Sequence, residues 1–329
     1  MSVKRALVTG ATGMLGLNLV QLLSELGWEV LALHRATSDV ATLDRFPVTK
    51  VVGDVTDLDS LLAALPEGVD AVFHTAASTS LWSRRRAAQE RTNVDGTRNV
   101  VEACLRRAAC RLVHTSSVVV WGFHDQPVSE DTPAFGERSS IGYFRTKALA
   151  EGEVRSGIAR GLDAVILNPA NIIGRHDVSN WSRALRMVHD GSLPGVPPGR
   201  ASFCHARQVA EAHVAAVAQG QSGGRYLLGG ADASYLELIQ VIGAVAGKRV
   251  PDRPTPILVL RALGRVNHWL SYVTNREPDL TPEGVALVTS NLCCRSDRAQ
   301  RELGYRPSNL EEMVRDCWDW MRAERLLGP

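Results

Sequence analysis

Residues 8–16 read VTGATGMLG and place Gly10, Gly13 and Gly16 in the pattern T-G-x-x-G-x-x-G. Gly10 permits a sharp turn, Gly13 lets the backbone approach a pyrophosphate, and Gly16 lets a helix pack closely on a strand. A helix that begins here also directs free amide groups and the positive end of its dipole at the same point. Glycines alone would fit an ordinary tight turn, but their place between an apolar run and a helical pattern favours a dinucleotide site.

Outward from this turn, short β-branched runs alternate with longer helical patterns, which is typical of parallel strands joined by crossover helices. The strand candidates are residues 5–10, 29–35, 50–55, 70–76, 111–117 and 163–170. The helical patterns lie near residues 13–26, 57–65, 85–109 and 140–160. Runs that are apolar on both faces, such as Ala71-Val72-Phe73, suit a sheet covered by helices on both sides. The sequence therefore predicts an α/β fold with a doubly wound parallel sheet, the Rossmann arrangement.

The alternation breaks after about residue 170. Residues 191–200, GSLPGVPPGR, form a loop rich in proline and glycine. The pattern over 206–220 predicts an amphipathic helix, and 224–230 predicts a further strand. The remaining chain is expected to form helices separated by turns.

These changes suggest two units. We expect residues 1–170 to form a domain that binds a dinucleotide, and residues 206–230 to return to it. Residues 171–205 and 231–329 are expected to form a smaller, mostly helical substrate lobe. The chain then crosses between the units more than once.

Composition and charge narrow the classes of partner. The 329 residues include 37 basic and 35 acidic side chains, so the net charge of +2 argues against nucleic acid or an anionic membrane as the main partner. The run Arg84-Arg85-Arg86 fits a solvated helix face. The six cysteines lack the spacing of a zinc site, so no metal is expected and the thiols are expected to be reduced. The N-terminus has no signal-peptide pattern, and no apolar run approaches the ~18 residues of a membrane span, which predicts a cytoplasmic protein.

The end of the second strand bears on the choice of dinucleotide. A carboxylate there would bind the ribose hydroxyls of NAD, but this chain has His34-Arg35. A guanidinium binds a phosphate dianion through two charge-assisted hydrogen bonds, so Arg35 favours NADP. The alternative is a surface arginine that never meets the ligand. Asp54, at the end of the third strand, is placed to accept from the adenine amino group, and the backbone of 74–78 would run past the cofactor.

Several motifs come in the order and approximate spacing of a known family. They are VTGATGMLG, GDV, FHTAA, TNVDGTRNV, LVHTSS, YFRTK and LNPANIIG, with ELGYRP near the C-terminus. In these motifs the chain resembles the extended short-chain dehydrogenases/reductases, and within them the dihydroflavonol reductase-like NADP-dependent enzymes. The resemblance covers essentially the whole chain, closely in the cofactor half and loosely in the substrate lobe. It implies a set of cofactor contacts: Gly10, Thr12, Gly13, Met14, Leu15, Gly16, Arg35, Asp54, Val55, Thr75, Ala76, Ala77, Tyr143, Lys147, Pro169 and Asn171.

The same resemblance gives roles to Tyr143 and Lys147, which share a helix face at positions i and i+4. A cationic Lys147 would lower the pKa of Tyr143 from about 10, so that the phenol can donate a proton to a carbonyl or accept one from an alcohol. Lys147 would also hold the nicotinamide ribose. Ser117 would hydrogen-bond the reacting oxygen, with a strand-end cap as its alternative role and Ser116 as its rival. Asn93 matches the family's asparagine, which is associated with a water that feeds protons to the lysine.

Fold and motif do not select the reaction, because this set of residues serves reductases, epimerases and dehydratases. Related dehydratases carry acidic residues after the serine, whereas here Val118 follows Ser117. Sugar-nucleotide epimerases carry an arginine where this chain has Ala201, and Arg200 is displaced by one position. Together with Arg35 these departures favour an NADPH-dependent reductase of ketones or aldehydes over a nucleotide-sugar epimerase. A protein that binds NADP without catalysis is a third reading, which the intact catalytic set argues against.

The substrate, a small carbonyl compound or alcohol, is expected to meet three segments of the chain. Their candidate residues are Thr79, Trp82, Ser117, Trp121, Phe123, Asn171 and His205. The aromatic residues among them could form the apolar floor of the substrate pocket or, equally, pack between the two lobes. His205 could contact the substrate or occupy a buried core position. The histidines His74 and His114 fit core or cofactor-adjacent positions. Family habit also implies a homodimer through the helices over 85–109 and 140–160.

Overall fold

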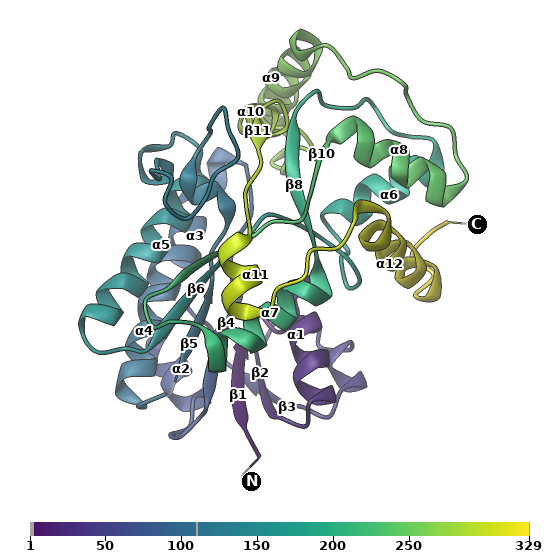
Figure 1. Cartoon of the computed structure of the whole chain (residues 1–329). Coiled ribbons are helices and arrows are strands. Elements are labelled where there is room, and N and C mark those ends of the chain that lie inside the picture. Colours follow the sequence, from purple (N-terminus) through teal and green to yellow (C-terminus); the bar gives the residue numbers. More distant parts are fainter. Residues whose placement is uncertain (1–2, 110, 329) are drawn as a thin grey trace.

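The computed structural model describes residues 3–109 and 111–328. A seven-stranded parallel sheet forms the larger part, in the order β3-β2-β1-β4-β5-β6-β9. Its strands are β1 (Arg5–Thr9), β2 (Glu29–His34), β3 (Thr49–Val52), β4 (Ala71–His74), β5 (Leu112–Thr115), β6 (Ala164–Pro169) and β9 (Arg225–Leu228). The predicted doubly wound sheet is confirmed. In Figure 1 the strands run upward, so their carboxyl ends face the second lobe.

Helices cover both faces of this sheet, because the strands are apolar on both sides. On β1, Ala6 and Val8 pack on one face, whereas Leu7 packs on the other. The first face is covered by α1 (Met14–Glu25), α7 (Ala206–Gln219) and α11 (Asp297–Leu303). The second face is covered by α2 (Leu58–Ala64), α4 (Gly96–Arg106) and α5 (Gly142–Ala159). Short 3-10 turns occur at η1 (Leu43–Arg45), η2 (Ser83–Arg85), η4 (Val118–Trp121) and η5 (Gly136–Arg138).

The helix expected over 85–109 is interrupted. It consists of α3 (Arg86–Glu90), a π-helical turn η3 (Arg91–Asp95) and α4. A π turn inserts one extra residue into the helical ladder, and such turns occur often at functional sites. Here the turn contains Asn93, whose side chain is buried.

The second lobe contains a small sheet that the sequence did not predict. Its central strand β8 (Arg200–His205) pairs with β10 (Ala231–Ser234) in antiparallel fashion and with β7 (Asn171–Ile173) and β11 (Asn291–Leu292) in parallel fashion. The partner strands have two to four residues each, too short for a periodic pattern. The helices of this lobe are α6 (Trp181–Asp190), α8 (Tyr235–Ala246), α9 (Ile257–Thr274), α10 (Pro282–Val288) and α12 (Leu310–Ala323).

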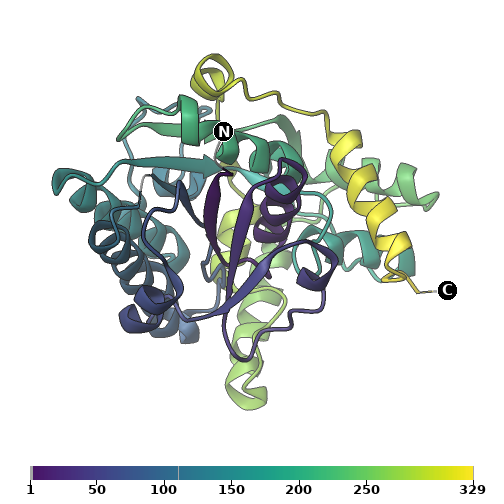
Figure 2. The same ribbon diagram turned by 90° about the horizontal axis from the view of Figure 1, so that it is seen from below.

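The chain returns to the large sheet more than once after residue 171. Helix α7 packs on α1, and β9 extends the sheet beside β6. Residues of α11 return as well, since Ala299 and Leu303 lie in the same core as β1 and α1. The sequence placed α11 in the substrate lobe; its apolar contacts are with the large sheet. Seen from below, α9 projects away from the rest of the molecule (Figure 2).

Candidate active site

The first turn contains two positions where no side chain fits. Gly10 follows β1 with a φ of 68°, and a Cβ atom there would lie 2.7 Å from the backbone nitrogen of Ala76. A Cβ atom at Gly16 would lie 2.1 Å from the carbonyl oxygen of Gly10. Glycine is therefore required at both positions for α1 to begin tightly against the end of β4.

Helix α1 begins at Met14 without a side-chain cap, with Gly13 as its N-cap residue and no acidic residue in the first turn. Its first amide groups are consequently free to bind an anion. Thr75 donates through its hydroxyl to the carbonyl oxygen of Thr9 over 2.7 Å, which holds the end of β4 beside this loop. The glycine turn, the uncapped helix and the adjacent strand ends fit the pyrophosphate of a dinucleotide.

Two predicted cofactor residues lie at the next strand ends. Arg35 directly follows β2, is exposed, and forms no ion pair among the residues that the structure describes. Asp54 follows β3, and its Oδ1 atom accepts from the backbone nitrogen and the hydroxyl of Thr56, each over 2.9 Å. This turn fixes the carboxylate at the edge of the sheet and leaves its Oδ2 atom for a ligand.

Lys147 is buried in α5, and its Nζ atom donates to the carbonyl oxygen of Thr115 over 2.7 Å. Burial lowers the pKa of the Lys147 ammonium to about 8, and the carboxylate of Glu151 opposes this shift. One N–H of the ammonium is committed to the end of β5. Two others remain for hydroxyl groups of a bound ribose.

Tyr143 lies one helical turn before Lys147 and is half-buried. Burial raises the pKa of its phenol, and a hydrogen bond with Ser117 opposes the rise. The direction is opposite to the one expected from the sequence, because desolvation outweighs the neighbouring groups and Lys147 binds Thr115 instead. The phenol is therefore protonated at neutral pH, which is the state that a proton donor requires.

Ser117 follows β5 in an extended conformation and caps the turn η4, where its Oγ atom accepts from the backbone nitrogen of Val119 over 3.4 Å. Its hydroxyl also meets the phenol of Tyr143. The hydroxyl of Ser116 is buried and has no hydrogen-bond partner within the described residues. Of the two serines, the one predicted from the sequence meets the tyrosine, and it acts as a strand-end cap as well.

Two buried residues behind Ser117 were not recognised in the sequence. Asn168 donates through Nδ2 to the carbonyl oxygen of Ser117 over 3.1 Å and to Oε1 of Glu151 over 2.6 Å. Glu151 is 1% exposed and forms ion pairs with Arg155 and Arg225. The spacing from Lys147 to Glu151 was an available signal, since positions i and i+4 share a helix face.

Asn93 connects the loop after β4 to α5. Its Oδ1 atom accepts from the backbone nitrogen of Ser78 over 2.7 Å, and its Nδ2 atom donates to the carbonyl oxygen of Ser78 and to the hydroxyl of Thr146. The side chain therefore uses its donors and its acceptor on protein groups. This geometry fits a positioning residue beside the tyrosine helix.

Three buried histidines lie below the site in neutral form. Burial lowers the pKa of His74 to about 3 and that of His213 to about 4, and it holds the pKa of His114 well below its ordinary value. His74 connects the hydroxyls of Thr9 and Thr97 over 2.8 and 3.0 Å. These contacts place His74 in a polar part of the core under the nucleotide turn, in agreement with a core or cofactor-adjacent position.

The aromatic residues expected to line the substrate site differ in their surroundings. Trp121 is fully buried, and its Nε1 atom donates to the carbonyl oxygen of Thr132, so it supports the fold and does not line an open surface. Trp82 is buried too, and its indole donates to the hydroxyl of Ser271 in α9. Phe123 is exposed and packs on Phe144 with 5.1 Å between ring centres.

The polar residues expected at the substrate site also have distinct environments. Thr79 is exposed in the loop after β4. Asn171 donates to the carbonyl oxygen of Ser202 over 3.1 Å and thus joins β7 to β8. His205 caps α7 by accepting from the backbone nitrogen of Arg207, and its other ring nitrogen lies 3.5 Å from the carboxylate of Asp316. His205 therefore has a structural partner on each ring nitrogen, and sequence alone did not reveal this.

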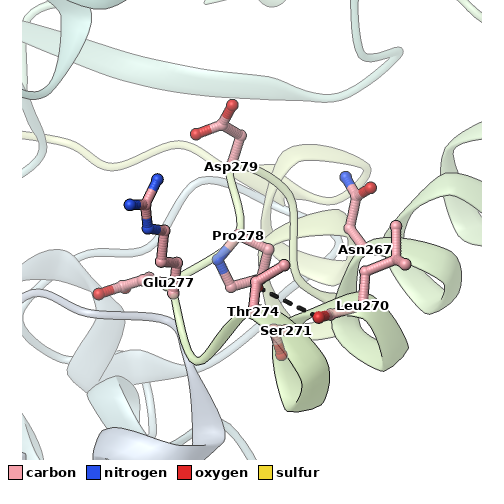
Figure 3. A pocket seen from close by; sticks show the side chains of 8 residues that line it. Asn267, Leu270, Ser271, Thr274, Glu277, Pro278 and Asp279 are labelled. Atoms are coloured by element: carbon pink, nitrogen blue, oxygen red, sulfur yellow. Dashed lines mark hydrogen bonds between the residues drawn. The ribbon is translucent and has the colours of Figure 1, made fainter.

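A hollow of about 220 Å³ lies beside α9 and the turn that follows it (Figure 3). Asn267, Leu270 and Ser271 line it from the helix, and Glu277 and Asp279 line it from the turn. A narrower hollow borders Trp82, Gln89 and Gly142, next to Tyr143. Ser117, Tyr143 and Lys147 line neither of these two hollows, and the narrower one comes nearest to them in the sequence, through Gly142.

The fold and the site together define an NAD(P)-dependent enzyme of the extended short-chain dehydrogenase/reductase type. The chain belongs to the NAD dependent epimerase/dehydratase family, whose model matches residues 6–229. A relative from Methylococcus capsulatus named Sterol demethylase protein B is 32% identical over 326 residues, with 98% of this chain and 99% of the relative covered. A Synechocystis protein named Putative dihydroflavonol 4-reductase is 31% identical over 96% of this chain and 94% of its own length. The crystal structure of gox2253 has a TM-score of 0.86 and 31% identity, and the match covers 99% of this chain and 100% of that one.

Proposed function

We propose that the protein is an NADPH-dependent oxidoreductase that reversibly reduces a ketone or an aldehyde to an alcohol. The observation that carries the proposal is the meeting of Ser117, Tyr143 and Lys147 at the carboxyl end of β5. Ligands collect at this end of open parallel sheets. The name of the Synechocystis relative supports a reductase.

In this mechanism Ser117 and Tyr143 both hydrogen-bond the carbonyl oxygen of the substrate. The bound dinucleotide supplies a hydride to the carbonyl carbon. As the C=O π bond breaks, its electron pair moves to oxygen, which takes the phenolic proton of Tyr143 and becomes the alcohol. The resulting phenolate lies one helical turn from Lys147, whose ammonium stabilises it until a proton arrives from solvent.

The preference for NADPH rests on Arg35. Its exposed guanidinium follows β2 and has no acidic partner in the described parts of the chain. A 2′-phosphate would give it a bidentate, charge-assisted partner. We assign the 2′-phosphate to this side chain, with Asp54 near the adenine.

The small sheet favours the reductase over the nucleotide-sugar epimerase. Ala201, at the position of the epimerase arginine, is fully buried in β8. Its neighbour Arg200 is exposed and lies near Glu237 and the carbonyl oxygen of Asp232. Neither residue supplies a free cation for a sugar diphosphate.

Thermal unfolding with NADPH, NADH or UDP-sugars tests the cofactor, in the wild type and in Arg35→Ala. A ligand at about a hundredfold its Kd adds about 2.7 kcal/mol of stability. We expect NADPH to stabilise the wild type most, and Arg35→Ala to lose this preference.

NADPH oxidation with a panel of ketones and aldehydes then tests the reaction, and Tyr143→Phe is expected to lower kcat by about 10²- to 10⁴-fold without weakening NADPH binding. Epimerisation of a UDP-sugar without added cofactor, or equal stabilisation by NADH, would contradict the proposal.

A further inference from the structure

Helix α9 carries several large apolar side chains that are exposed to solvent. Leu258 and Val273 are each 74% exposed, and Trp269 is 68% exposed. Val259, Leu263, Val266 and Leu270 are exposed on the same helix. Contiguous apolar surface of this kind marks an interaction site in most folded proteins.

These residues occupy one side of the helix. With about 3.6 residues per turn, they fall within a single arc of about 140°. The arc consists of Leu258, Val259, Ala262, Leu263, Val266, Trp269, Leu270 and Val273. The residues that pack on the protein, Leu260, Gly264 and Ser271, lie on the other side. The apolar arc therefore faces away from the molecule.

The only charged residues of α9 are basic. Arg261 and Arg265 are exposed along one edge of the apolar arc, and residues 257–274 contain no Asp or Glu. The acidic residues of the following turn are engaged elsewhere: Glu277 lies 3.5 Å from Arg85, and Asp279 lies 2.6 Å from Arg183. The arc and its edge thus combine exposed apolar groups with uncompensated positive charge.

The chain holds α9 firmly in this orientation. The indole of Trp82 donates to the hydroxyl of Ser271 over 3.2 Å, and Arg84 donates to the carbonyl oxygen of Ser271 over 3.1 Å. Arg84 also lies over the ring of Tyr272, 5.2 Å from its centre. The contacts with Ser271 secure the helix through the side opposite the arc, and α9 itself lies at the edge of the molecule (Figures 1 and 2).

We propose that α9 binds the surface of an anionic phospholipid bilayer, with its apolar arc among the upper acyl chains and Arg261 and Arg265 at the headgroups. An interfacial helix has this combination of a Trp- and Leu-bearing apolar face beside basic residues. A second copy of the chain fits less well, because a two-fold interface through α9 would bring like-charged arginines together without an acid between them. The inference concerns peripheral binding: among the described residues no helix is long and apolar enough to cross a membrane. It does not depend on the reductase assignment.

Co-sedimentation with vesicles tests the proposal. We expect the full chain to sediment with vesicles that contain phosphatidylglycerol and to bind phosphatidylcholine vesicles much more weakly. The triple variant Val266→Ser/Trp269→Ser/Val273→Ser should weaken binding at least about tenfold. Arg261→Gln/Arg265→Gln should weaken binding to the anionic vesicles by about thirtyfold and leave binding to phosphatidylcholine unchanged.

Matched controls replace exposed residues of the same kind on other elements. Leu26→Ser, just after α1, and Arg301→Gln, in α11, are expected to bind the anionic vesicles like the wild type. A cooperative thermal transition like that of the wild type would show that each variant is folded, and the arginine variant keeps the test valid if the serine variant does not fold. Absence of binding, or equal binding of both α9 variants and the wild type, would overturn the proposal. A wild-type dimer that becomes a monomer in the serine variant would also overturn it and assign α9 to contacts between copies.

Discussion

At the residue scale, the first turn requires a residue without a side chain at position 10. The left-handed backbone there and the nearby nitrogen of Ala76 both exclude a Cβ atom. We expect Gly10→Ala to lower the free energy of unfolding by at least about 1–2 kcal/mol, the usual cost of this backbone conformation for a residue with a side chain. The shift of β4 that makes room should also abolish dinucleotide binding. Denaturant titration and NADPH titration measure the two effects.

Gly152→Ala is the matched control. Gly152 lies inside α5, and a Cβ atom there meets no atom within 4 Å. Because alanine favours a helix more than glycine does, this variant should gain about 0.5–1 kcal/mol and bind NADPH normally. If Gly10→Ala behaves like Gly152→Ala, the turn does not require glycine.

Lys147 gives a pH-dependent prediction. Burial lowers its pKa from 10.5 to about 8, so between these values the unfolded chain binds more protons than the folded chain. Stability contributed by this residue therefore rises with pH from about 8 to 10.5, by at most about 1.4 kcal/mol per pH unit. We expect Lys147→Met to remove that rise and to be at least as stable as the wild type near pH 7, while its reductase activity falls.

Denaturant unfolding of both proteins from pH 7 to pH 10.5 measures the difference directly. Parallel curves for the wild type and Lys147→Met would show that Lys147 has an ordinary pKa in the folded chain. Activity that survives in the variant would contradict the role of Lys147 in the proposed mechanism.

At the scale of elements, β5, β6 and α5 are joined by one buried network. Asn168 on β6 binds both the carbonyl oxygen of Ser117 and the carboxylate of Glu151 in α5. Arg225 on β9 completes the network as an ion pair with Glu151 over 3.3 Å, and its guanidinium lies 4.1 Å from the ring centre of Trp121. This arrangement explains why Trp121 packs inside the protein and does not line the substrate site.

Glu151→Gln tests the network through the pKa of Lys147. The carboxylate of Glu151 raises that pKa, so its removal should move the corresponding limb of the pH–kcat/KM profile to lower pH. Glutamine keeps an acceptor for Asn168, and the variant is expected to remain folded. An unchanged profile, with only a loss of stability, would assign Glu151 a purely structural role.

At the scale of the whole molecule, Asp316 in α12 ties the second lobe to the chain that leaves the large sheet. Its carboxylate accepts from the backbone nitrogen, Nε and Nη2 of Arg175 over 2.6–3.1 Å. Burial alone would raise the pKa of Asp316, but the hydrogen bonds and charge of Arg175 reverse this and hold the pKa below 3.8. A depressed carboxyl pKa stabilises the fold above the unfolded value and loses that contribution as pH falls through the folded value.

We expect Asp316→Asn to lower the free energy of unfolding at pH 7 by about 1.5–3 kcal/mol, the usual range for hydrogen bonds to a charged group. The difference in unfolding free energy between variant and wild type should narrow as the pH falls from 3.8 through the lower pKa of the folded state, because the unfolded chain then binds more protons than the folded one. Denaturant titrations of both proteins at pH 7 and below pH 3.8 measure this difference. If the difference in unfolding free energy is constant with pH, the charge of Asp316 does not stabilise the contact between the lobes.

At the same scale, net charge does not describe any single surface of the chain. A total of +2 averages over all surfaces of the chain, whereas α9 gathers two arginines and an apolar arc without an acid. The balance of 37 basic and 35 acidic residues therefore says little about one exposed helix. The arc itself is visible only once burial shows which side of the helix packs on the protein.

The sequence by itself determined the parallel sheet, the glycine turn and the placement of Tyr143 and Lys147 one helical turn apart, because these features follow from local periodicity, backbone freedom and helical spacing. Tertiary structure alone decided the direction of the Tyr143 pKa, since it depends on desolvation by distant segments. It likewise decided that Trp121 is buried, that Asn168 and Glu151 lie behind Ser117, and that α9 faces outward. Each of these depends on contacts between residues far apart in the chain, which no local pattern records.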